Sequence, residues 1–459
     1  MAGHKNLYIR TFGCQMNVHD SEQIEELLKE KGYRRTDNEK NADLIIINTC
    51  SIREKAEQKA YSLLGRFRKL KEINPGLIIG IGGCVAQQMG ADLIKKAPYL
   101  DLVFGTHNIH RLPAMLQYVQ KNGNRAVETS FHESVKSLGI QTLPRHGRVR
   151  SYVTIMQGCN NFCSFCVVPY LRGREESRDS SDIINEIKFL ADHGIREITL
   201  LGQNVNSYGK TLHNSSNFPS LLKKIGDEAG IERIRFTTSH PKDLSDDLIA
   251  CFAEVDSLCK HIHLPVQSGS DYILQRMNRH YTSKEYLKKV EKLRDVCSNI
   301  SITSDIIVGF PGEKDNDFQK TIDLMEKVRF DNTFSFKYSV RSGTAAERYD
   351  DKVPESVKSK RLEVVQSLQK RHTLESNRAL EGRVEDILVE GYSKNKRTDV
   401  VGRTGTNKIV NFKASGDIIG TIVRVKITKA YINSLRGKLI AKRRGIGNVS
   451  RNESIWFSY

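Results

Sequence analysis

Short apolar runs alternate with amphipathic stretches along the first part of the chain. Three runs rich in β-branched residues each end just before a cysteine: 7–13 before Cys14, 42–49 before Cys50 and 76–83 before Cys84. Such runs predict buried parallel strands, and the helical patterns between them, 21–31 and 52–72, complete an α/β arrangement. We expect the first helix to begin at Asp20 or Ser21. Because the carboxyl ends of parallel strands meet at one edge of an open sheet, the three cysteines are predicted to meet there.

The middle of the chain repeats a strand-then-helix pattern six times. Strands are predicted at 151–156, 197–201, 233–238, 261–266, 301–308 and 333–340. Amphipathic helical stretches such as 180–193 and 283–297 separate them. Repeated units of this kind imply a parallel sheet with right-handed crossovers, and six are too few for an eight-stranded barrel. We therefore expect a partial (β/α)6 barrel with its functional residues at the carboxyl ends of the strands.

The chain changes character after a long charged helical stretch at 356–377. Five short segments mix apolar and basic residues between Gly and Asn: 384–390, 400–403, 408–412, 420–430 and 437–441. This pattern predicts a small antiparallel β-barrel of OB-like type, a fold that commonly binds oligonucleotides. A structural cap is the alternative.

The fold class is thus α/β with three domains and a tail. An N-terminal open parallel α/β sheet domain, 1–141, continues past Cys84 through a helix near 87–96 to a strand at 100–105. A linker-like stretch leads to the central partial barrel, 145–376, and the small β-barrel, 377–442, precedes a basic tail, 443–459.

The charge distribution narrows the choice of partners. The 459 residues carry a formal net charge of +18, and residues 376–459 hold 17 Lys and Arg against 7 Asp and Glu, a net of +10. This concentration favours nucleic acid over a merely soluble basic surface. No apolar run approaches the ~20 residues of a membrane span, and the start of the chain lacks the apolar core of a signal peptide. We expect a cytoplasmic protein whose thiols stay reduced.

Three further cysteines, Cys159, Cys163 and Cys166, form a CxxxCxxC motif at the end of the first predicted barrel strand. Three thiolates can ligate three irons of a cubane cluster and leave the fourth iron open, whereas a cluster that only carries electrons normally takes four cysteines. A zinc site prefers four closed ligands, and no second CxxC follows nearby. The spacing favours an iron–sulfur cluster over zinc or inert thiols. The scattered set suggests a second cluster, against the alternative of ordinary buried cysteines.

The other polar candidates carry weaker signals. Cys251, Cys259 and Cys297 lie in helical patterns without common spacing and are interpreted as packing residues. His240, His261 and His263 lie at strand ends and could serve substrate or proton transfer, although structural histidines are commoner. Glu313 could pair with a cation or cap a helix.

The CxxxCxxC motif resembles that of radical S-adenosylmethionine enzymes, and further motifs resemble those of methylthiotransferases over residues 6–441. The similar segments are TFGCQMN (11–17), NTCSIRE (48–54), GGCVAQ (82–87), LGQNVNSY (201–208), HLPVQSGS (263–270) and DIIVGFPGE (305–313). The last β-unit resembles a TRAM domain. Among subfamilies, FTTSHP (236–241) and GRTGTNKIVNF (402–412) look most like the bacterial MiaB branch of tRNA methylthiotransferases. Val85 and Ser304 depart from the family, where methionine and threonine are common.

The resemblance implies two [4Fe–4S] clusters and S-adenosylmethionine as cofactors. Cys159, Cys163 and Cys166 would hold the radical-generating cluster, and Cys14, Cys50 and Cys84 an auxiliary cluster whose open iron carries a sulfur atom. One S-adenosylmethionine would methylate that sulfur, and a second would yield the 5′-deoxyadenosyl radical that removes hydrogen from adenine C2. Cofactor contacts are expected at Gly202, Gln203, Asn204, Ser239, Gln267, Ser268 and Gly309, with Gln203 near the methionine amino end.

The MiaB branch adds a methylthio group at C2 of N6-isopentenyladenosine 37 in tRNA. The resemblance therefore implies the anticodon stem-loop of tRNA as partner, an electron donor such as a flavodoxin or ferredoxin, and a sulfur donor. We expect a monomer. Alternative substrates are N6-threonylcarbamoyladenosine 37 or a ribosomal protein, and the basic C-terminal unit argues for RNA. An alternative from another class of function is a non-catalytic, metal-stabilised RNA-binding protein. Its iron content would distinguish it from the enzyme.

Overall fold

The computed structural model describes residues 4–51, 54–131, 142, 144, 147–213, 216–394 and 398–442, without the side chains of 54–57 and 442. Residues 143, 145 and 146 of the predicted linker and the whole basic tail lie outside the described residues. The chain divides into two compact units, Met1–His372 and Thr373–Tyr459. Within the described ranges, no helix is long and apolar enough to cross a membrane.

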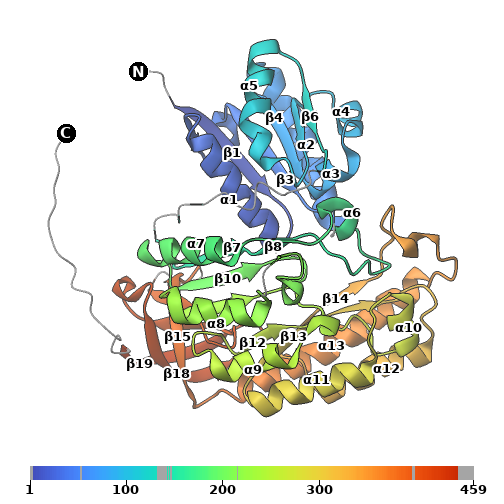
Figure 1. The fold of residues 1–459 in the computed structure, drawn as a ribbon, viewed down its shortest axis with the longest axis vertical. Helices are drawn as coiled ribbons and strands as arrows, with labels where there is room; N and C mark the ends of the chain where they lie inside the picture. The colour runs from blue at the N-terminus through green and yellow to red at the C-terminus, as the bar shows by residue number, and fades with distance from the viewer. Residues whose placement is uncertain are drawn as a thin grey trace. The chain divides into compact units, whose positions relative to one another are not determined.

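Six parallel strands form the first sheet, in the order β2-β1-β3-β4-β5-β6 (Figure 1). Their bounds are Lys5–Thr11 (β1), Tyr33–Arg35 (β2), Leu44–Thr49 (β3), Ile78–Gly83 (β4), Leu102–Phe104 (β5) and Ala126–Glu128 (β6). Central strand β3 is buried along its whole length, as its run of apolar residues requires. The sequence pattern missed the short edge strands β2 and β6.

Helices cover both faces of this sheet. They are Gln15–Lys29 (α1), Glu54–Ile73 (α2), Cys84–Met89 (α3), Asp92–Lys96 (α4) and Leu112–Asn122 (α5). One apolar core lies between the sheet and α2, α3 and α4, and a second lies between the opposite face and α1 and α5. This double covering matches the predicted parallel α/β domain.

Two helices of this domain differ from their predicted extents. Helix α1 begins at Gln15 with Cys14 as its N-cap, so the expected start at Asp20 or Ser21 is wrong. Both residues are buried and serve other contacts: Ser21 Oγ hydrogen-bonds Thr11 Oγ1 at 2.7 Å, and Asp20 pairs with an arginine described below. The helix expected at 87–96 is interrupted by Gly90, whose φ of 50° breaks it into α3 and α4.

The six predicted barrel strands are all present and form two three-stranded parallel sheets, β11-β10-β7 and β12-β13-β14. Their bounds are Arg150–Thr154 (β7), Glu197–Leu201 (β10), Arg233–Phe236 (β11), His261–His263 (β12), Ser301–Val308 (β13) and Asn332–Lys337 (β14). A bridge between Ile234 and Leu258 connects the two halves. The predicted partial (β/α)6 barrel is therefore correct in strand number and order.

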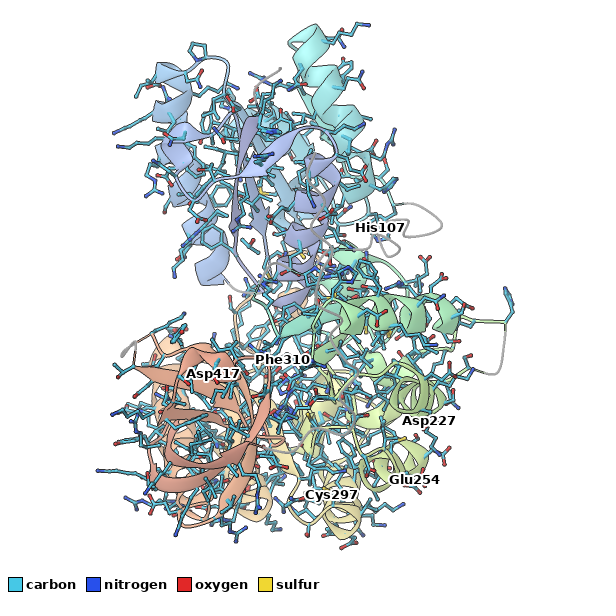
Figure 2. All side chains as sticks on the ribbon, turned by 90° about the vertical axis from the view of Figure 1, so that its left-hand side faces the viewer. His107, Asp227, Glu254, Cys297, Phe310 and Asp417 are labelled. Carbon is cyan, nitrogen blue, oxygen red and sulfur yellow. The ribbon has the colours of Figure 1, made fainter. Side chains whose placement is uncertain are left out.

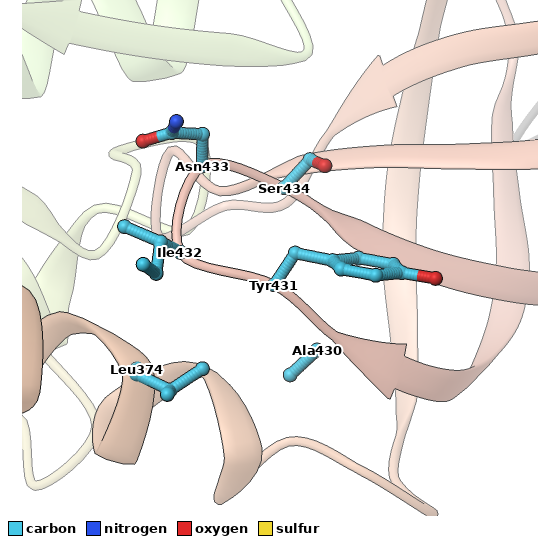
Figure 3. A pocket seen from close by; sticks show the side chains of 6 residues that line it. All are labelled: Leu374, Ala430, Tyr431, Ile432, Asn433 and Ser434. Atoms are coloured by element: carbon cyan, nitrogen blue, oxygen red, sulfur yellow. The ribbon is translucent and has the colours of Figure 1, made fainter.

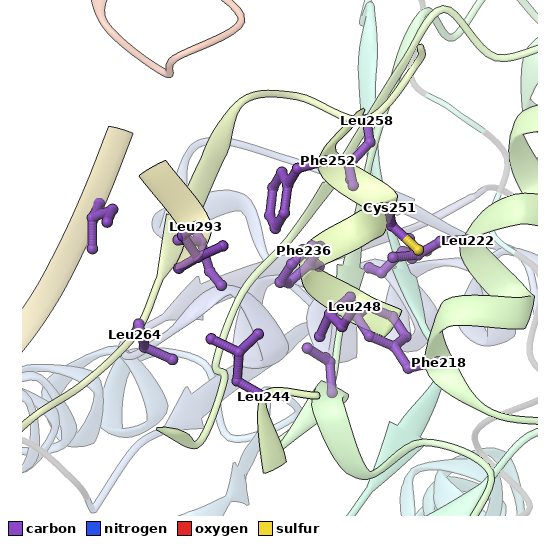
Figure 4. Close-up of a cluster of buried hydrophobic side chains, with 14 of the residues drawn as sticks. Phe218, Leu222, Phe236, Leu244, Leu248, Cys251, Phe252, Leu258, Leu264 and Leu293 are labelled. Atoms are coloured by element: carbon purple, nitrogen blue, oxygen red, sulfur yellow. The ribbon is translucent and has the colours of Figure 1, made fainter. Parts of the chain in front are cut away.

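A single apolar core separates these strands from the outer helices. The helices are Ser180–Asp192 (α7), Phe218–Glu228 (α8), Asp246–Glu254 (α9), Ser283–Val296 (α11) and Asp315–Val328 (α12). Figure 4 shows Phe218, Phe236 and Phe252 packed together in this core, with Cys251 among them. Alternate strand residues lie on the opposite face, and several of them form ion pairs there, such as Arg235 with Glu197.

The non-motif cysteines have the packing environment that we expect. Cys251 has no exposed surface, and Cys259 and Cys297 are also buried. Burial raises the pKa of each thiol. One detail differs from the sequence pattern, because Cys259 precedes β12 and is not in a helix.

The second unit is a closed five-stranded barrel in the order β15-β16-β17-β19-β18. Its strands are Val384–Tyr392 (β15), Asp399–Arg403 (β16), Ile409–Lys413 (β17), Ile422–Ala430 (β18) and Leu435–Lys442 (β19). The pairs are antiparallel except β17 with β19, whose parallel pairing closes the barrel. The expectation of a purely antiparallel barrel is corrected at that seam. Beside β18 lies an open hollow, lined by Leu374, Ala430, Tyr431, Ile432, Asn433 and Ser434 (Figure 3).

Candidate active site

The three scattered cysteines, here called the N-terminal triad (Cys14, Cys50, Cys84), follow three adjacent strands. Cys14 comes after β1, Cys50 after β3, and Cys84 is the first residue of α3, directly after β4. A hydrogen bond with Cys50 lowers the pKa of the Cys84 thiol. Burial raises the pKa of Cys14, and the charge of Cys84 adds to this increase. The sheet therefore brings the three thiols together at its carboxyl edge.

Glycines next to the triad allow the strand ends to approach one another. A Cβ on Gly13, which has a φ of 137°, would lie 2.5 Å from Cys50 Cβ. A Cβ on Gly83, with a φ of 88°, would lie 2.4 Å from the Thr49 carbonyl oxygen. No other residue fits either position without moving the cysteines apart.

Buried amides hold these strand ends in register. Asn17 Nδ2 donates to Asn48 Oδ1 at 3.2 Å and to Thr49 O at 3.1 Å, and Asn48 Nδ2 donates back to Asn17 O at 2.9 Å. Asn17 Oδ1 also accepts from Cys14 Sγ at 3.3 Å. Nearby, the Ser51 hydroxyl is buried without a partner among the described residues. The edge is thus a hydrogen-bonded, thiol-rich part of the domain that has an unpartnered buried hydroxyl.

The other cysteines, here called the loop triad (Cys159, Cys163, Cys166), lie in the loop after β8 (Met156–Gln157). Cys163 acts electrostatically on both of the other thiols. Burial raises the pKa of Cys159 to about 11 and that of Cys166 to about 12. These thiols are therefore protonated at neutral pH without a metal, and metal binding must release their protons.

Two side chains from distant parts of the chain contact Cys163. Arg279 Nη1 donates to Cys163 Sγ at 3.3 Å, and the guanidinium is held by the Tyr281 hydroxyl and the Pro265 carbonyl. The Cys163 sulfur is 4.0 Å from His240 Nε2. Burial, then the charges of Arg279 and Lys242, lower the pKa of His240, so its imidazole is neutral. The sequence pattern indicated His240 only as a weak functional candidate. It missed Arg279, because no local motif surrounds that residue.

The donor set fits iron–sulfur clusters. A cubane cluster spreads three thiolates over three irons, whereas a zinc ion takes four ligands on one atom. Both triads consist of thiols alone, the ligands that iron–sulfur clusters take, so they fit clusters better than a closed zinc site.

Several buried polar atoms at strand ends lack protein partners, as a site for a polar cofactor requires. Two belong to predicted contacts: Ser239 Oγ and Gln267 Oε1 are both unpartnered within the described chain. Gln267 also adopts a φ of 72°, a strained conformation for a non-glycine residue. Gln157 Nε2, next to the loop triad, is a third such atom that the sequence pattern did not single out. These groups fit the zwitterion and hydroxyls of S-adenosylmethionine.

The remaining predicted cofactor contacts mainly shape the loops. Gln203 Oε1 accepts from Gly158 N at 2.6 Å and so fixes the start of the cysteine loop. Both polar atoms of Asn204 are engaged, with Asp243 Oδ2 at 2.8 Å and His240 N at 3.1 Å.

Ser268, Gly202 and Gly309 likewise have structural contacts. The Ser268 hydroxyl accepts from Ser270 N at 3.2 Å. A Cβ on Gly202 would lie 2.5 Å from Met156 Cγ, and one on Gly309 would lie 2.3 Å from Lys358 Cγ. These positions therefore support the site through backbone and packing.

The sequence offered two roles for Glu313, pairing with a cation or capping a helix. In the structure Glu313 pairs with a cation, Arg361. Glu313 Oε2 accepts from Arg361 Nη1 at 2.7 Å and from Gly309 N at 2.5 Å. Burial raises the pKa of this carboxyl, while these donors oppose the shift.

Inside the barrel, strands β12, β13 and β14 present an aromatic and polar wall. His263 Nε2 lies 3.5 Å from Asp305 Oδ1, and its ring packs edge-on against Phe334 at 5.9 Å between centroids. Asp305 pairs in register with Phe334, on the face opposite the residues that pack on the helices. Phe334 is 48% exposed and Phe336 39% exposed, so two large rings line the interior uncovered. His261 and His263 both lie within hydrogen-bonding distance of the Thr303 hydroxyl, at 3.3 Å and 3.0 Å. We therefore give His261 a smaller part in this wall than His263.

The second unit has a basic outer surface on the β18–β19 pair. Lys426 and Lys438 are exposed and lie directly opposite each other, a like-charge pairing that is unfavourable without an anionic partner. Arg424 is exposed on the same strand. Tyr431, at the turn, is 48% exposed, and Lys429 Nζ lies 5.6 Å from its ring centroid. Charge beside an open aromatic ring suits single-stranded nucleic acid.

Comparisons with known proteins agree with this layout. The chain matches the uncharacterized protein family UPF0004 over residues 6–105, the radical SAM superfamily over 153–325 and the TRAM domain over 378–440. It is 60% identical over 438 residues to the tRNA-2-methylthio-N(6)-dimethylallyladenosine synthase of Syntrophus aciditrophicus, covering 95% of each chain. It is 52% identical over 444 residues to the Geobacter sulfurreducens protein of the same name, covering 96% of this chain and 99% of the relative.

Solved structures with low sequence identity share the fold. The radical S-adenosylmethionine methyltransferase TsrM from Kitasatospora setae, with tryptophan substrate and a SAM analog bound, has a TM-score of 0.55 at 14% identity and covers 72% of both chains. TsrM with cobalamin and a [4Fe-4S] cluster bound has a TM-score of 0.54 at 13% identity, over 75% of this chain and 77% of that one. At such identity the likeness concerns the fold alone.

Proposed function

The chain belongs to the family of tRNA-2-methylthio-N6-dimethylallyladenosine synthases, and from that premise we propose that it adds a methylthio group to C2 of N6-isopentenyladenosine 37 in tRNA. The observation that carries this proposal is the 60% identity over 438 residues to a relative of that name. Two thiol triads and a basic β-barrel on the same chain support it. We assign the three domains proposed from the sequence, 1–141, 145–376 and 377–442, to the auxiliary, radical and RNA-binding parts of this function.

The six triad cysteines are the proposed ligands of two [4Fe–4S] clusters. When bound, these clusters and S-adenosylmethionine supply a methylthio group and a radical that can break an unactivated C–H bond. Cys159 and Cys163 are buried, which limits the access of water to this chemistry, and the Arg279 guanidinium places a permanent positive charge beside Cys163. Ser239, Gln267 and Gln157 offer unused polar atoms for the cofactor's methionine and ribose groups.

The interior wall is the proposed contact for the modified base. Phe334 and Phe336 are large rings left uncovered inside the barrel, and an adenine with an apolar N6 substituent can pack against them. The neighbouring His263–Asp305 pair adds hydrogen-bonding groups at the same place. A single-stranded loop can present its base to this wall without unpairing a duplex.

The second unit supports RNA as the substrate carrier. Its exposed lysines can neutralise phosphates, and Tyr431 can stack on an unpaired base. The proposal also includes an electron donor such as a flavodoxin or ferredoxin and a sulfur donor, with the chain acting as a cytoplasmic monomer, as the family resemblance implies.

A substrate competition tests the proposed specificity. The iron-loaded protein receives equal amounts of tRNA with N6-isopentenyladenosine, tRNA with N6-threonylcarbamoyladenosine and a ribosomal protein, and mass spectrometry identifies which one gains a methylthio group. We expect the isopentenyl tRNA alone to react. Modification of either competitor instead would reassign the substrate, and modification of none by a protein with both clusters would contradict the enzyme assignment.

A further inference from the structure

A buried ion pair joins the segment after the loop triad to the helix after the N-terminal triad. Arg172 ends α6 (Val168–Arg172), six residues after Cys166, and only 3% of its surface is exposed. Its Nη2 donates to Asp20 Oδ2 at 2.6 Å. Asp20 lies on α1, the helix whose N-cap is Cys14. Arg172 thus extends from the barrel part of the chain to the N-terminal triad.

The backbone around Arg172 is fixed from the N-terminal side. Thr106 Oγ1 donates to Leu171 O at 2.8 Å, and His107 Nε2 lies 3.0 Å from Arg172 O; His107 is labelled in Figure 2. Leu171 and Val167 also pack against Cys84 in a small apolar cluster. The guanidinium is therefore held in one place.

The Arg172 guanidinium interacts with the thiols as well as with Asp20, and a side-chain hydrogen bond joins it to Cys84. Burial works against its charge, yet the Asp20 carboxylate and the Cys84 and Cys14 thiols raise its pKa, so the group stays charged. Its second terminal nitrogen, Nη1, is buried and has no hydrogen-bond partner among the described residues.

Two other buried arginines use their Nη1 on protein atoms. Arg178 uses its Nη1 on Thr154 O and Glu186 Oε2, both at 2.7 Å, and Arg279 engages all three of its nitrogens. A charged buried donor without an acceptor is costly, and such groups mark positions where a ligand completes the bonding. The missing acceptor of Arg172 lies beside the N-terminal triad.

We propose that Arg172 binds, through Nη1, the anionic sulfur species (sulfide or methanethiolate) carried at the N-terminal triad, and that Asp20 is the positioning residue for its guanidinium. The inference rests on the proposed auxiliary cluster. Arginine suits this role because its charge is permanent and its planar fork can serve Asp20 with one nitrogen and the sulfur with the other. A positive charge at this point also favours the more reduced, more negative cluster.

The test uses the full chain with Cys159, Cys163 and Cys166 replaced by alanine, so that only the N-terminal triad can hold a cluster. After anaerobic loading with iron and sulfide, sodium methanethiolate is titrated into the reduced protein and its binding is followed by EPR. We expect Arg172→Met to weaken binding about 10- to 100-fold and Arg172→Lys to weaken it less. The cluster's reduction potential should also become more negative in Arg172→Met, because a positive charge is lost beside it; methanethiolate affinity is the readout that separates sulfur binding from this charge effect.

Matched variants separate sulfur binding from a structural role. Arg178→Met removes another buried ion pair, with Glu186, and should leave methanethiolate affinity and the potential unchanged. If a methionine variant does not fold, the lysine variants at the same two positions give the comparison. Equal methanethiolate affinity in the Arg172 variants and the parent would overturn the inference and leave Arg172 with a structural role between the two triads. Absence of iron at the triad in the parent would instead contradict the proposed auxiliary cluster, and the inference with it.

Discussion

Arg279 Nη1 donates to Cys163 Sγ at 3.3 Å, across 116 positions of sequence. Each triad thus has its own buried arginine, Arg279 at the loop triad and Arg172 at the N-terminal triad. Because a guanidinium does not lose its charge, each triad lies next to a permanent positive charge in a water-poor site. Two largely buried thiol triads, each beside a positive charge, suit two anionic clusters.

Removing the Arg279 charge should make the loop-triad cluster harder to reduce. We expect Arg279→Met to retain iron but to shift the reduction potential to a more negative value and to slow reductive cleavage of S-adenosylmethionine about tenfold, the effect of one lost charge-assisted hydrogen bond. EPR-monitored redox titration measures the shift. Tyr281→Phe, which removes only the hydroxyl that holds Arg279 Nε, should have a smaller effect; equal effects would argue against the charge as the cause.

Cysteine variants should fall into two classes by iron content. The parent should hold about eight irons, and alanine at Cys84 or Cys163 should remove about four, because each triad serves one four-iron cluster. Cys251→Ala, in the core of Figure 4, should keep all the iron and lose only stability, by roughly 1–3 kcal/mol for the small cavity. Iron analysis and thermal unfolding of the same samples check this. Iron loss in Cys251→Ala would contradict the division of the cysteines.

The iron-free protein should lose stability in acid partly through His240. Burial and nearby positive charges lower the pKa of His240 far below its ordinary 6.5, so the folded chain keeps it neutral. In the unfolded chain this histidine binds a proton below about pH 6.5. The free energy of unfolding should therefore fall by about 1.4 kcal/mol for each pH unit of acidification below that pH. His240→Gln should flatten this decline in denaturant unfolding. His193→Gln, at an exposed position, should not; an unchanged slope in His240→Gln would refute the assignment.

Phe334 should matter for substrate binding more than for the reaction step. Phe334→Ala removes an exposed ring from the interior wall, so we expect KM for the isopentenyl tRNA to rise about tenfold, the effect of one lost base–ring contact, with a smaller change in kcat. The control Val296→Ala alters another exposed apolar residue, at the end of α11. A normal KM in Phe334→Ala would place the base elsewhere in the barrel.

Neutralising the basic pair on the second unit should weaken tRNA binding in a salt-dependent way. The double change of Lys426 and Lys438 to alanine should lower affinity and reduce the slope of log K against log salt by about one unit per lysine lost from a phosphate contact. Binding titrations at several salt concentrations measure this. Lys188→Ala, an exposed lysine on α7, is the control. An unchanged slope in the double variant would remove this surface from the RNA interface.

The sequence predicted what depends on local pattern. Apolar runs located the central strands of the three parallel sheets, and a cysteine after each of three runs located the N-terminal triad, because strand ends of a parallel sheet share an edge. The predicted start of α1 was wrong because polar residues that resemble caps take part in tertiary contacts instead. Asp20 and Ser21 look like helix caps, yet they face inward and take partners elsewhere, so α1 begins earlier than their chemistry suggests.

Residues that act across long sequence distances could not be predicted. Arg172 and Arg279 lie in stretches without a distinctive spacing, and only the fold brings them to the triads. The loops in which cofactor contacts are predicted do follow strands β10, β11, β12 and β13, but pattern alone does not show which atoms lack partners. Asn204 has both polar atoms engaged, whereas Ser239 and Gln267 have buried atoms without described partners.

The most direct test of the account is an anaerobic single-turnover assay. The iron-loaded protein, dithionite, S-adenosylmethionine and tRNA with N6-isopentenyladenosine are combined, and nucleosides are read by mass spectrometry. The account predicts 2-methylthio-N6-isopentenyladenosine from the parent; Cys84→Ala forms 5′-deoxyadenosine without that product, and Cys163→Ala forms neither. Product from Cys84→Ala, or no product from the parent with full iron, would contradict two cooperating thiol triads as the basis of function.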